Sequence, residues 1–220
     1  MEKALLFSGG MDSTTLLWWL RDRGESVRAI SVDYGQRHRV ELQWAAALAE
    51  GLGVPHKTIS LDLNTIGGSP LTDAHLDVPA AEDGAQVRTV VPFRNMLFVT
   101  LAAAYAETQG IDELYLAPVK DDYAAYRDCR RIFYDSLEQS LALGATRDTS
   151  FRLYTPFVDR WKVDVVKIGI ELGVPYEKTH TCYEGRRPAC GRCDACSERI
   201  AAFRANGVRD PLEYEVELVW

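Results

Sequence analysis

A group of glycine and hydroxyl residues stands near the start of the chain, in the stretch LLFSGGMDST at residues 5–14. Gly9 and Gly10 allow the backbone to turn sharply and to approach a ligand closely. A helix beginning just afterwards would point its free amide groups, and the positive end of its dipole, at that ligand. This pattern predicts an anion site. The hydroxyls that would add further donors are Ser8, Ser13 and Thr14.

Asp12 occupies the position at which a Walker A loop has its lysine. A carboxylate repels phosphate unless a cation bridges them, so Asp12 implies Mg²⁺ bound with the nucleotide. The alternative is a Gly-Gly turn whose Ser and Asp side chains only cap a helix. The whole string S-G-G-x-D-S-T resembles the pyrophosphate loop (PP-loop) of the ATP pyrophosphatases, which cleave ATP between the α and β phosphates to form an adenylate. The resemblance implies nucleotide contacts for Ser8, Gly9, Gly10, Met11, Asp12, Ser13 and Thr14.

Four of the five cysteines lie close together near the other end of the chain, with the spacing C-x7-C-x2-C-x2-C. Two-residue gaps let neighbouring thiolates converge on one tetrahedral ion, and Gly191 permits the tight turn of a zinc knuckle. The spacing therefore predicts structural Zn²⁺, with an iron–sulfur cluster as the alternative. The predicted ligands are Cys182, Cys190, Cys193 and Cys196.

Short apolar runs alternate with helical patterns along most of the chain. The runs at 3–7, 27–34, 56–61, 113–117 and 151–157 predict strands. Helices are expected at 13–23, 37–51, 92–108, 128–143 and 161–172. Five alternations predict an α/β fold, a Rossmann-like parallel sheet with helices on both faces. Ligands of such sheets bind at the carboxyl ends of the strands, where the Gly-Gly turn lies.

Composition limits the classes of partner. A chain of 220 residues with 47% hydrophobic residues can form one main core with a small appendage. The net charge of −7 and the lack of a long Lys/Arg run argue against direct nucleic-acid binding, so a small-molecule substrate is expected. No leader-like segment and no run of about 18 apolar residues is present, which predicts a cytoplasmic protein without a membrane span.

Residues 62–91 interrupt the alternation with three Gly and two Pro and show no clear period. A loop of this length inside a compact domain is usually functional or disordered. We favour a lid or a dimer contact over a mobile surface excursion.

Motifs in order along nearly the whole chain resemble the 7-cyano-7-deazaguanine synthase family of the queuosine and archaeosine pathways. They are SGGMDST, YGQRH, GGSPLT, VPFRN, DCR, ELGVPYEKTHTCYEG and CGRCDAC. The resemblance implies the adenine-nucleotide α-hydrolase type of fold and a carbon–nitrogen ligase activity. Family members take 7-carboxy-7-deazaguanine, ATP and ammonia, form an amide through an acyl adenylate, and dehydrate the amide to a nitrile with a second ATP. A homodimer is expected.

Activating a carboxylate beside ATP requires cations, and Arg94 and Lys162 are the candidates. VPFRN opens a helix, and Lys162 follows the fifth strand, so both would lie at the carboxyl edge. Tyr34 and Gln36 end the second strand, where this fold reads the adenine or the substrate base. Two acidic residues that match the family, Asp122 and Asp128, complete the catalytic candidates, and Cys129 is expected to form a pocket wall. His56 and His75 are expected to be structural or on the surface, whereas no role is assigned to His38 or His180.

The chain departs from the family pattern at four positions on the presumed substrate side, namely Phe93, Val119, Ala125 and Arg127. If they line the pocket, the adenylated carboxylate could be joined to a protein amine, as in an antiviral defence system, with nitrile formation slow or absent. A silent nucleotide-binding module is a third alternative, which the intact loop disfavours. The predicted units are a PP-loop domain at 1–175 and a zinc-binding segment at 176–220.

Overall fold

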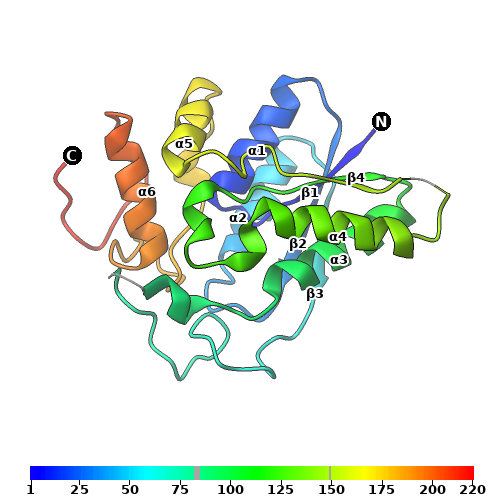
Figure 1. The fold of residues 1–220 in the computed structure, drawn as a ribbon. Helices are drawn as coiled ribbons and strands as arrows, with labels where there is room; N and C mark the ends of the chain where they lie inside the picture. The colour runs from blue at the N-terminus through cyan, green and yellow to red at the C-terminus, as the bar shows by residue number, and fades with distance from the viewer. Residues whose placement is uncertain (82–84, 149) are drawn as a thin grey trace.

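The computed structural model describes residues 1–81, 85–148 and 150–220. Its centre is a sheet of five parallel strands in the order β3-β2-β1-β4-β5 (Figure 1). Strand order reverses between β1 and β4, and this reversal opens a crevice at the carboxyl ends of the strands. The strands are β1 (Lys3–Leu6), β2 (Val27–Asp33), β3 (His56–Ser60), β4 (Glu113–Tyr115) and β5 (Arg152–Tyr154).

Five predicted helices are present, with boundaries that shift by at most four residues, at the start of α2. They are α1 (Met11–Asp22), α2 (Glu41–Gly51), α3 (Arg94–Thr108), α4 (Arg131–Gly144) and α5 (Lys162–Glu171). A sixth helix, α6 (Asp194–Ala205), was not predicted, because its sequence lacks a clear apolar period. The structure also contains four short 3₁₀ helices that were not predicted, η1 (Ala85–Thr89), η2 (Lys120–Tyr123), η3 (Arg127–Cys129) and η4 (Tyr176–Lys178).

The three inner strands β2, β1 and β4 are largely buried, as expected for a parallel sheet with helices on both faces, whereas the edge strands β3 and β5 are more exposed. Alternate residues of one strand enter different cores, because side chains point to opposite faces in turn. On β1, Leu5 packs with α1, α2 and α5, whereas Ala4 packs with α3 and α4. This doubly covered sheet confirms the predicted fold class. Among the described helices, none is long and apolar enough to cross a membrane.

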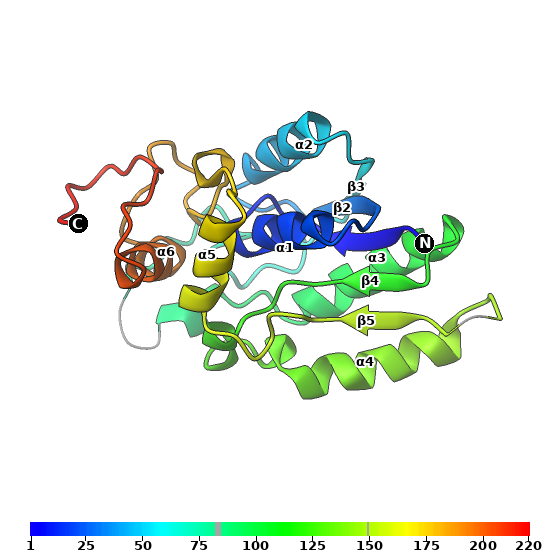
Figure 2. The ribbon, with the colours of Figure 1, turned by 90° about the horizontal axis from the view of Figure 1, so that it is seen from above.

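The end of the chain returns to the first turn. Helices α5 and α6 pack side by side at the end of the molecule towards which the strands point (Figure 2). The segment that joins them is tied to the first turn and to α1: His180 N donates to Gly9 O at 3.1 Å, and the hydroxyls of Thr15 and Tyr176 lie 2.7 Å apart. The C-terminal segment therefore closes over the carboxyl edge of the sheet.

The long segment at 62–91 is anchored by a few buried residues, while about half of its described residues are exposed. Leu63 and Leu71 are buried with Tyr34 in a small apolar cluster, and Ala80 forms a bridge with Cys193. These contacts hold parts of the segment against the turn after β2 and against the cysteine cluster. Residues 82–84 of this segment lie outside the described residues, and the lid or dimer role stays a prediction, as does the boundary between the units 1–175 and 176–220.

Candidate active site

A cavity of about 270 Å³ lies at the carboxyl edge of the sheet, between the Gly-Gly turn, α3, α5 and the segment before α6. Nine predicted site residues line it: Ser8, Gly10, Met11, Asp12, Ser13, Tyr34, Arg94, Asp122 and Lys162. Four others do not line it but contact or adjoin residues that do: Gly9, Thr14, Gln36 and Asp128. The structure thus brings together most of the groups that the sequence singled out.

The first glycine of the Gly-Gly turn has no room for a side chain. Gly9 has a φ of 76°, and a Cβ added there would lie 2.8 Å from the backbone nitrogen of Ala45 and 2.9 Å from the carbonyl oxygen of Glu41. Only glycine fits this close approach between β1, α1 and α2. Ser8 Oγ accepts from Gly10 N at 3.2 Å and lies 3.1 Å from Ser13 Oγ, so both hydroxyls sit at the start of α1.

Lys162 is buried among carboxylates at the start of α5. Its Nζ lies 2.6 Å from Glu198 Oε2, on α6, and 3.7 Å from Asp12 Oδ2, on α1. Burial alone would lower the pKa of Lys162, but Asp12 and Glu198 outweigh it and hold that pKa well above its ordinary value. Lys162 is therefore a fixed positive charge that ties three helices together.

Asp12 has one carboxylate oxygen without a protein partner. Oδ1 is buried and accepts no hydrogen bond in the described part of the chain, while Oδ2 faces Lys162. Burial raises the pKa of Asp12, and Lys162 only partly offsets this. A buried unpaired carboxylate oxygen needs a cation or a donor, so this atom fits a Mg²⁺ ion brought in with a nucleotide.

The other two acidic candidates differ from each other. Asp122 lines the cavity, accepts from Val119 N at 3.1 Å, and has its pKa raised to about 6, chiefly by burial. Asp128 instead accepts from Asn95 N at 3.2 Å, in the first turn of α3. Asp128 therefore holds the helix that carries Arg94, and its carboxylate is not a wall of the cavity.

Arg94 stands among aromatic rings. Its Nη1 donates to Tyr34 Oη at 3.2 Å, and its guanidinium carbon lies 5.8 Å and 5.9 Å from the ring centres of Tyr34 and Phe98. Tyr126 and Tyr183 also line the cavity. Burial raises the pKa of Tyr34 to about 12, so its hydroxyl stays protonated. This side of the cavity thus combines flat apolar walls with the partly buried guanidinium of Arg94, which suits a planar ring that bears an anionic group.

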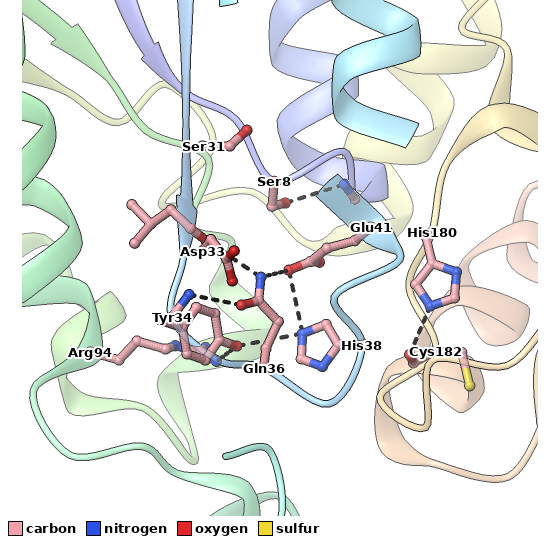
Figure 3. A network of polar contacts seen from close by, with 12 residues as sticks. Ser8, Ser31, Asp33, Tyr34, Gln36, His38, Glu41, Arg94, His180 and Cys182 are labelled. Atoms are coloured by element: carbon pink, nitrogen blue, oxygen red, sulfur yellow. Dashed lines mark hydrogen bonds and ion pairs between the residues drawn. The ribbon is translucent and has the colours of Figure 1, made fainter. Parts of the chain in front are cut away.

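Gln36 organises the turn after β2. Its Oε1 accepts from Tyr34 N at 2.9 Å and its Nε2 donates to Glu41 Oε1 at 3.0 Å (Figure 3). His38 Nε2 lies 3.5 Å from both Glu41 Oε1 and Tyr34 Oη. Burial lowers the pKa of His38 to about 3 and raises that of Glu41 to about 7. The imidazole is therefore neutral, and Glu41 titrates near neutrality.

The four predicted cysteine ligands converge. Their sulfurs all lie within 4.8 Å of one another, and the four side chains are buried. Cys190 Sγ and Cys196 Sγ are 3.9 Å apart, the separation expected for two corners of a tetrahedron with Zn–S bonds of about 2.3 Å. Cys193 and Cys196 start α6, the helix that carries Glu198. This donor set fits a metal ion, and tetrahedral thiolate ligation is what Zn²⁺ prefers.

Comparison with known proteins agrees with this geometry. The family model described as queuosine biosynthesis protein QueC matches residues 3–207. The chain belongs to the QueC family. A 7-cyano-7-deazaguanine synthase from Clostridium kluyveri is 42% identical over 225 residues, covering 99% of this chain and 100% of the relative. One from Methanoregula boonei is 44% identical over 218 residues, covering 98% of this chain and 100% of the relative.

Among solved structures, an NMN synthetase from Francisella tularensis matches with a TM-score of 0.50 and 16% identity, covering 94% of this chain and 77% of that one. This likeness concerns the fold alone. The QueC match confirms the family predicted from the sequence motifs, and with it the queuosine setting. Nothing in the comparisons supports a protein-conjugating relative.

The prediction that the four departures from the family pattern lie on the substrate side of the site is wrong for this QueC family chain. Val119 is fully buried in the core with Phe157 and Val165, and only its backbone faces Asp122. Phe93 is 70% exposed at the start of α3. Neither of them lines the cavity, and the same holds for Ala125 and Arg127. The four departures therefore give no reason to expect a different acceptor.

Several cavity residues of this QueC family chain were not predicted. Glu41 starts α2 only five residues after Gln36, and Glu198 lies on α6, a helix without a clear apolar period, so no motif marked either residue. His38 and His180 had been left without a role, and both line the cavity, whereas Cys129 lines it as predicted. Burial raises the pKa of Cys129, so its thiol stays protonated.

Proposed function

We propose that this chain catalyses the reaction for which its relatives are named, the synthesis of 7-cyano-7-deazaguanine. The substrates would be 7-carboxy-7-deazaguanine, ATP and ammonia, and the products would include AMP and pyrophosphate. The observation that carries the proposal is the single cavity that joins the SGGMDS turn with Arg94 and Lys162. Such an enzyme is a carbon–nitrogen ligase that uses ATP.

In the proposed reaction the first turn binds the ATP phosphates. The amide groups at the start of α1 and the hydroxyls of Ser8 and Ser13 would donate to phosphate oxygens. Asp12 would hold Mg²⁺ through Oδ1, and this ion would screen the charge of the triphosphate. Lys162 would stabilise the negative charge that develops as the α–β bond breaks, because it is positioned before the substrate arrives.

The deazaguanine ring would lie against the aromatic wall. Arg94 would bind the carboxylate that attacks the α phosphate, with Tyr34 orienting its guanidinium. Asp122 would face the same region, and Asp128 would act through Asn95 by fixing the first turn of α3. Gln36 would act through Tyr34 and Glu41.

The cysteine cluster would hold structural Zn²⁺, because four thiolates fill the tetrahedron and leave no position for a substrate. We propose that residues 1–175 form the PP-loop domain and that 176–220 form a zinc-binding segment packed on it. A homodimer in the cytoplasm remains our expectation for the assembled enzyme.

The test is an assay with the acid, ATP, Mg²⁺ and ammonium, with nucleotides separated by chromatography and the base identified by mass spectrometry. We expect AMP, pyrophosphate and nitrile. Asp12→Asn should lose activity, whereas Asp22→Asn, at the exposed far end of the same helix, should keep it. ADP and orthophosphate as the main nucleotide products, or no consumption of the acid, would contradict the proposal.

A further inference from the structure

Glu41 lines the cavity, and only one of its two carboxylate oxygens has a hydrogen-bond partner among the described residues. Oε1 accepts from Gln36 at 3.0 Å and lies 3.5 Å from His38, whereas Oε2 accepts no hydrogen bond from any residue that the structure describes. The side chain is 11% exposed, and the residue lines the cavity. Such an oxygen can accept a hydrogen bond from a ligand that enters the cavity.

Glu41 also lacks a countercharge. No lysine or arginine nitrogen of the described chain lies within ion-pair distance of it, that is within 4.0 Å. The titratable groups around it are His38 and Tyr34 after β2, Arg94 on α3, and His180 and Tyr183 on the facing segment that surrounds His38. His38 is neutral, and Arg94 is too far away to form an ion pair with Glu41. A cationic ligand would therefore supply the countercharge that this carboxylate lacks.

Its place beside the first turn matters too. The carbonyl oxygen of Glu41 is one of the atoms that a side chain at Gly9 would strike, and Figure 3 shows the carboxylate between Ser8 and His38. A small cation held by Glu41 would therefore lie beside the phosphate-binding turn, where the proposed adenylate would form.

The proposed reaction needs a nitrogen nucleophile that is in the wrong protonation state in solution. Ammonia is mostly ammonium near neutral pH, and ammonium has no lone pair with which to attack a carbonyl. We propose that Glu41 binds the ammonium ion and removes its proton, delivering ammonia to the adenylated carboxylate. This inference rests on the proposed function and adds a catalytic residue to it.

The step balances as follows. An N–H bond of ammonium breaks and its proton passes to Glu41 Oε2, which frees the nitrogen lone pair. That pair forms the C–N bond, the C–O bond to AMP breaks with its electrons on AMP, and the nitrogen's surplus proton leaves with the AMP phosphate. Glu41 then returns its proton to water. Its pKa of about 7 suits this cycle, because a general base is most effective when its pKa lies near the working pH.

The experiment separates adenylation from amide formation in Glu41→Gln. The first measurement is exchange of labelled pyrophosphate into ATP in the presence of the acid, which needs no ammonia. The second is amide and nitrile formation from ammonium, and the third is product formation from hydroxylamine, which is largely neutral at the same pH. Glu50→Gln, on an exposed part of the same helix, is the matched control.

We expect Glu41→Gln to keep exchange and hydroxylamine reactivity within about twofold of the wild type and to lose about 100-fold in ammonium-dependent product. In the wild type this rate should rise with pH through about 7 and then level off, whereas the residual rate of the variant should follow the free ammonia and keep rising above that pH. Unchanged ammonium use would overturn the inference, as would loss of exchange, because Glu41 would then serve ATP or the base. Absence of exchange in the wild type would instead refute the proposed function itself.

Discussion

Replacing Lys162 by methionine tests the charge arrangement on which the proposed adenylation depends. Methionine keeps the length and much of the apolar stem but removes the ammonium that lies 2.6 Å from Glu198 and 3.7 Å from Asp12. The variant therefore leaves neighbouring carboxylates without their shared cation, in a site that already raises the pKa of Asp12 by burial. We expect a loss of both activity and stability.

The magnitudes follow from the burial of the group. Lys162 has a side chain only 9% exposed, and removing one partner of a buried ion pair costs about 3–5 kcal/mol. For a chain of this size that corresponds to a fall in Tm of roughly 6–20 °C. Removing one preorganised charge from a reacting phosphate typically lowers the rate by about 10²–10³-fold, which is the decrease we expect in pyrophosphate exchange.

The loss of stability in Lys162→Met should depend on pH in a direction that follows from the neighbouring carboxyls. Lys162 lowers the pKa values of Asp12 and Asp122, so its removal raises both. A carboxyl whose folded-state pKa lies above its unfolded value stabilises the fold below the unfolded pKa, and this contribution is lost as the pH rises through the folded pKa. The pKa of Asp122 is already about 6, so the stability deficit of Lys162→Met should be smaller at about pH 5 than at about pH 8.

The assays are pyrophosphate exchange and urea unfolding at both pH values, with Lys167→Met, an exposed residue of the same helix, as the control. Lys162→Arg should recover part of the stability but little of the exchange, because the guanidinium is larger and differently shaped. Wild-type exchange in Lys162→Met, or a stability deficit that grows on acidification, would refute the reasoning.

Three further predictions concern other parts of the molecule. Cys193→Ala should lose the single bound Zn²⁺ and the solubility of the protein, as measured by metal analysis and sedimentation; pure, folded wild type without zinc would contradict this. Asp210→Ala should lower the free energy of unfolding by about 3–5 kcal/mol, because it leaves the fully buried guanidinium of Arg199 without its carboxylate partner. Asp159→Ala, which removes one partner of an exposed ion pair, should change that free energy by less than about 1 kcal/mol. Glu41→Gln should be more stable than the wild type by about 1–3 kcal/mol at about pH 8 and equal to it at about pH 4, because burial raises the pKa of this carboxyl from 4.5 to about 7. Equal unfolding curves at both pH values would show that burial of Glu41 is not unfavourable.

Much of this fold could be predicted because the local signals agree with each other. The strand runs 27–34 and 56–61 contain apolar and β-branched residues and lie next to Gly35 and Gly53, and they correspond closely to β2 and β3. Helix α6 escaped detection because its buried face includes the polar residues Asp194 and Arg199, and the burial of Arg199 depends on its distant partner Asp210. A periodicity in apolar residues does not report such partners.

The candidate site was predictable where a motif and a position in the fold coincide. The turn at 8–14, Arg94 and Lys162 each follow or open an element at the carboxyl edge, and all three lie on one cavity. Val119 was misjudged because its neighbours along the chain face the cavity while its own side chain points into the core. The direction in which a side chain points from a short irregular segment depends on the backbone angles, and residue spacing in the sequence does not determine these angles.

The closure of the first turn by the last quarter of the chain has a consequence for biosynthesis. Gly9 bonds to His180, Thr15 to Tyr176, and Asp12 faces Lys162, so each contact spans some 150 residues or more of sequence. During translation the strands of the sheet can pair as they emerge, but the C-terminal wall of the cavity can form only after the cysteine segment has left the ribosome. We therefore expect nascent chains, and products truncated before Lys162, to lack the complete cavity and with it the proposed use of ATP.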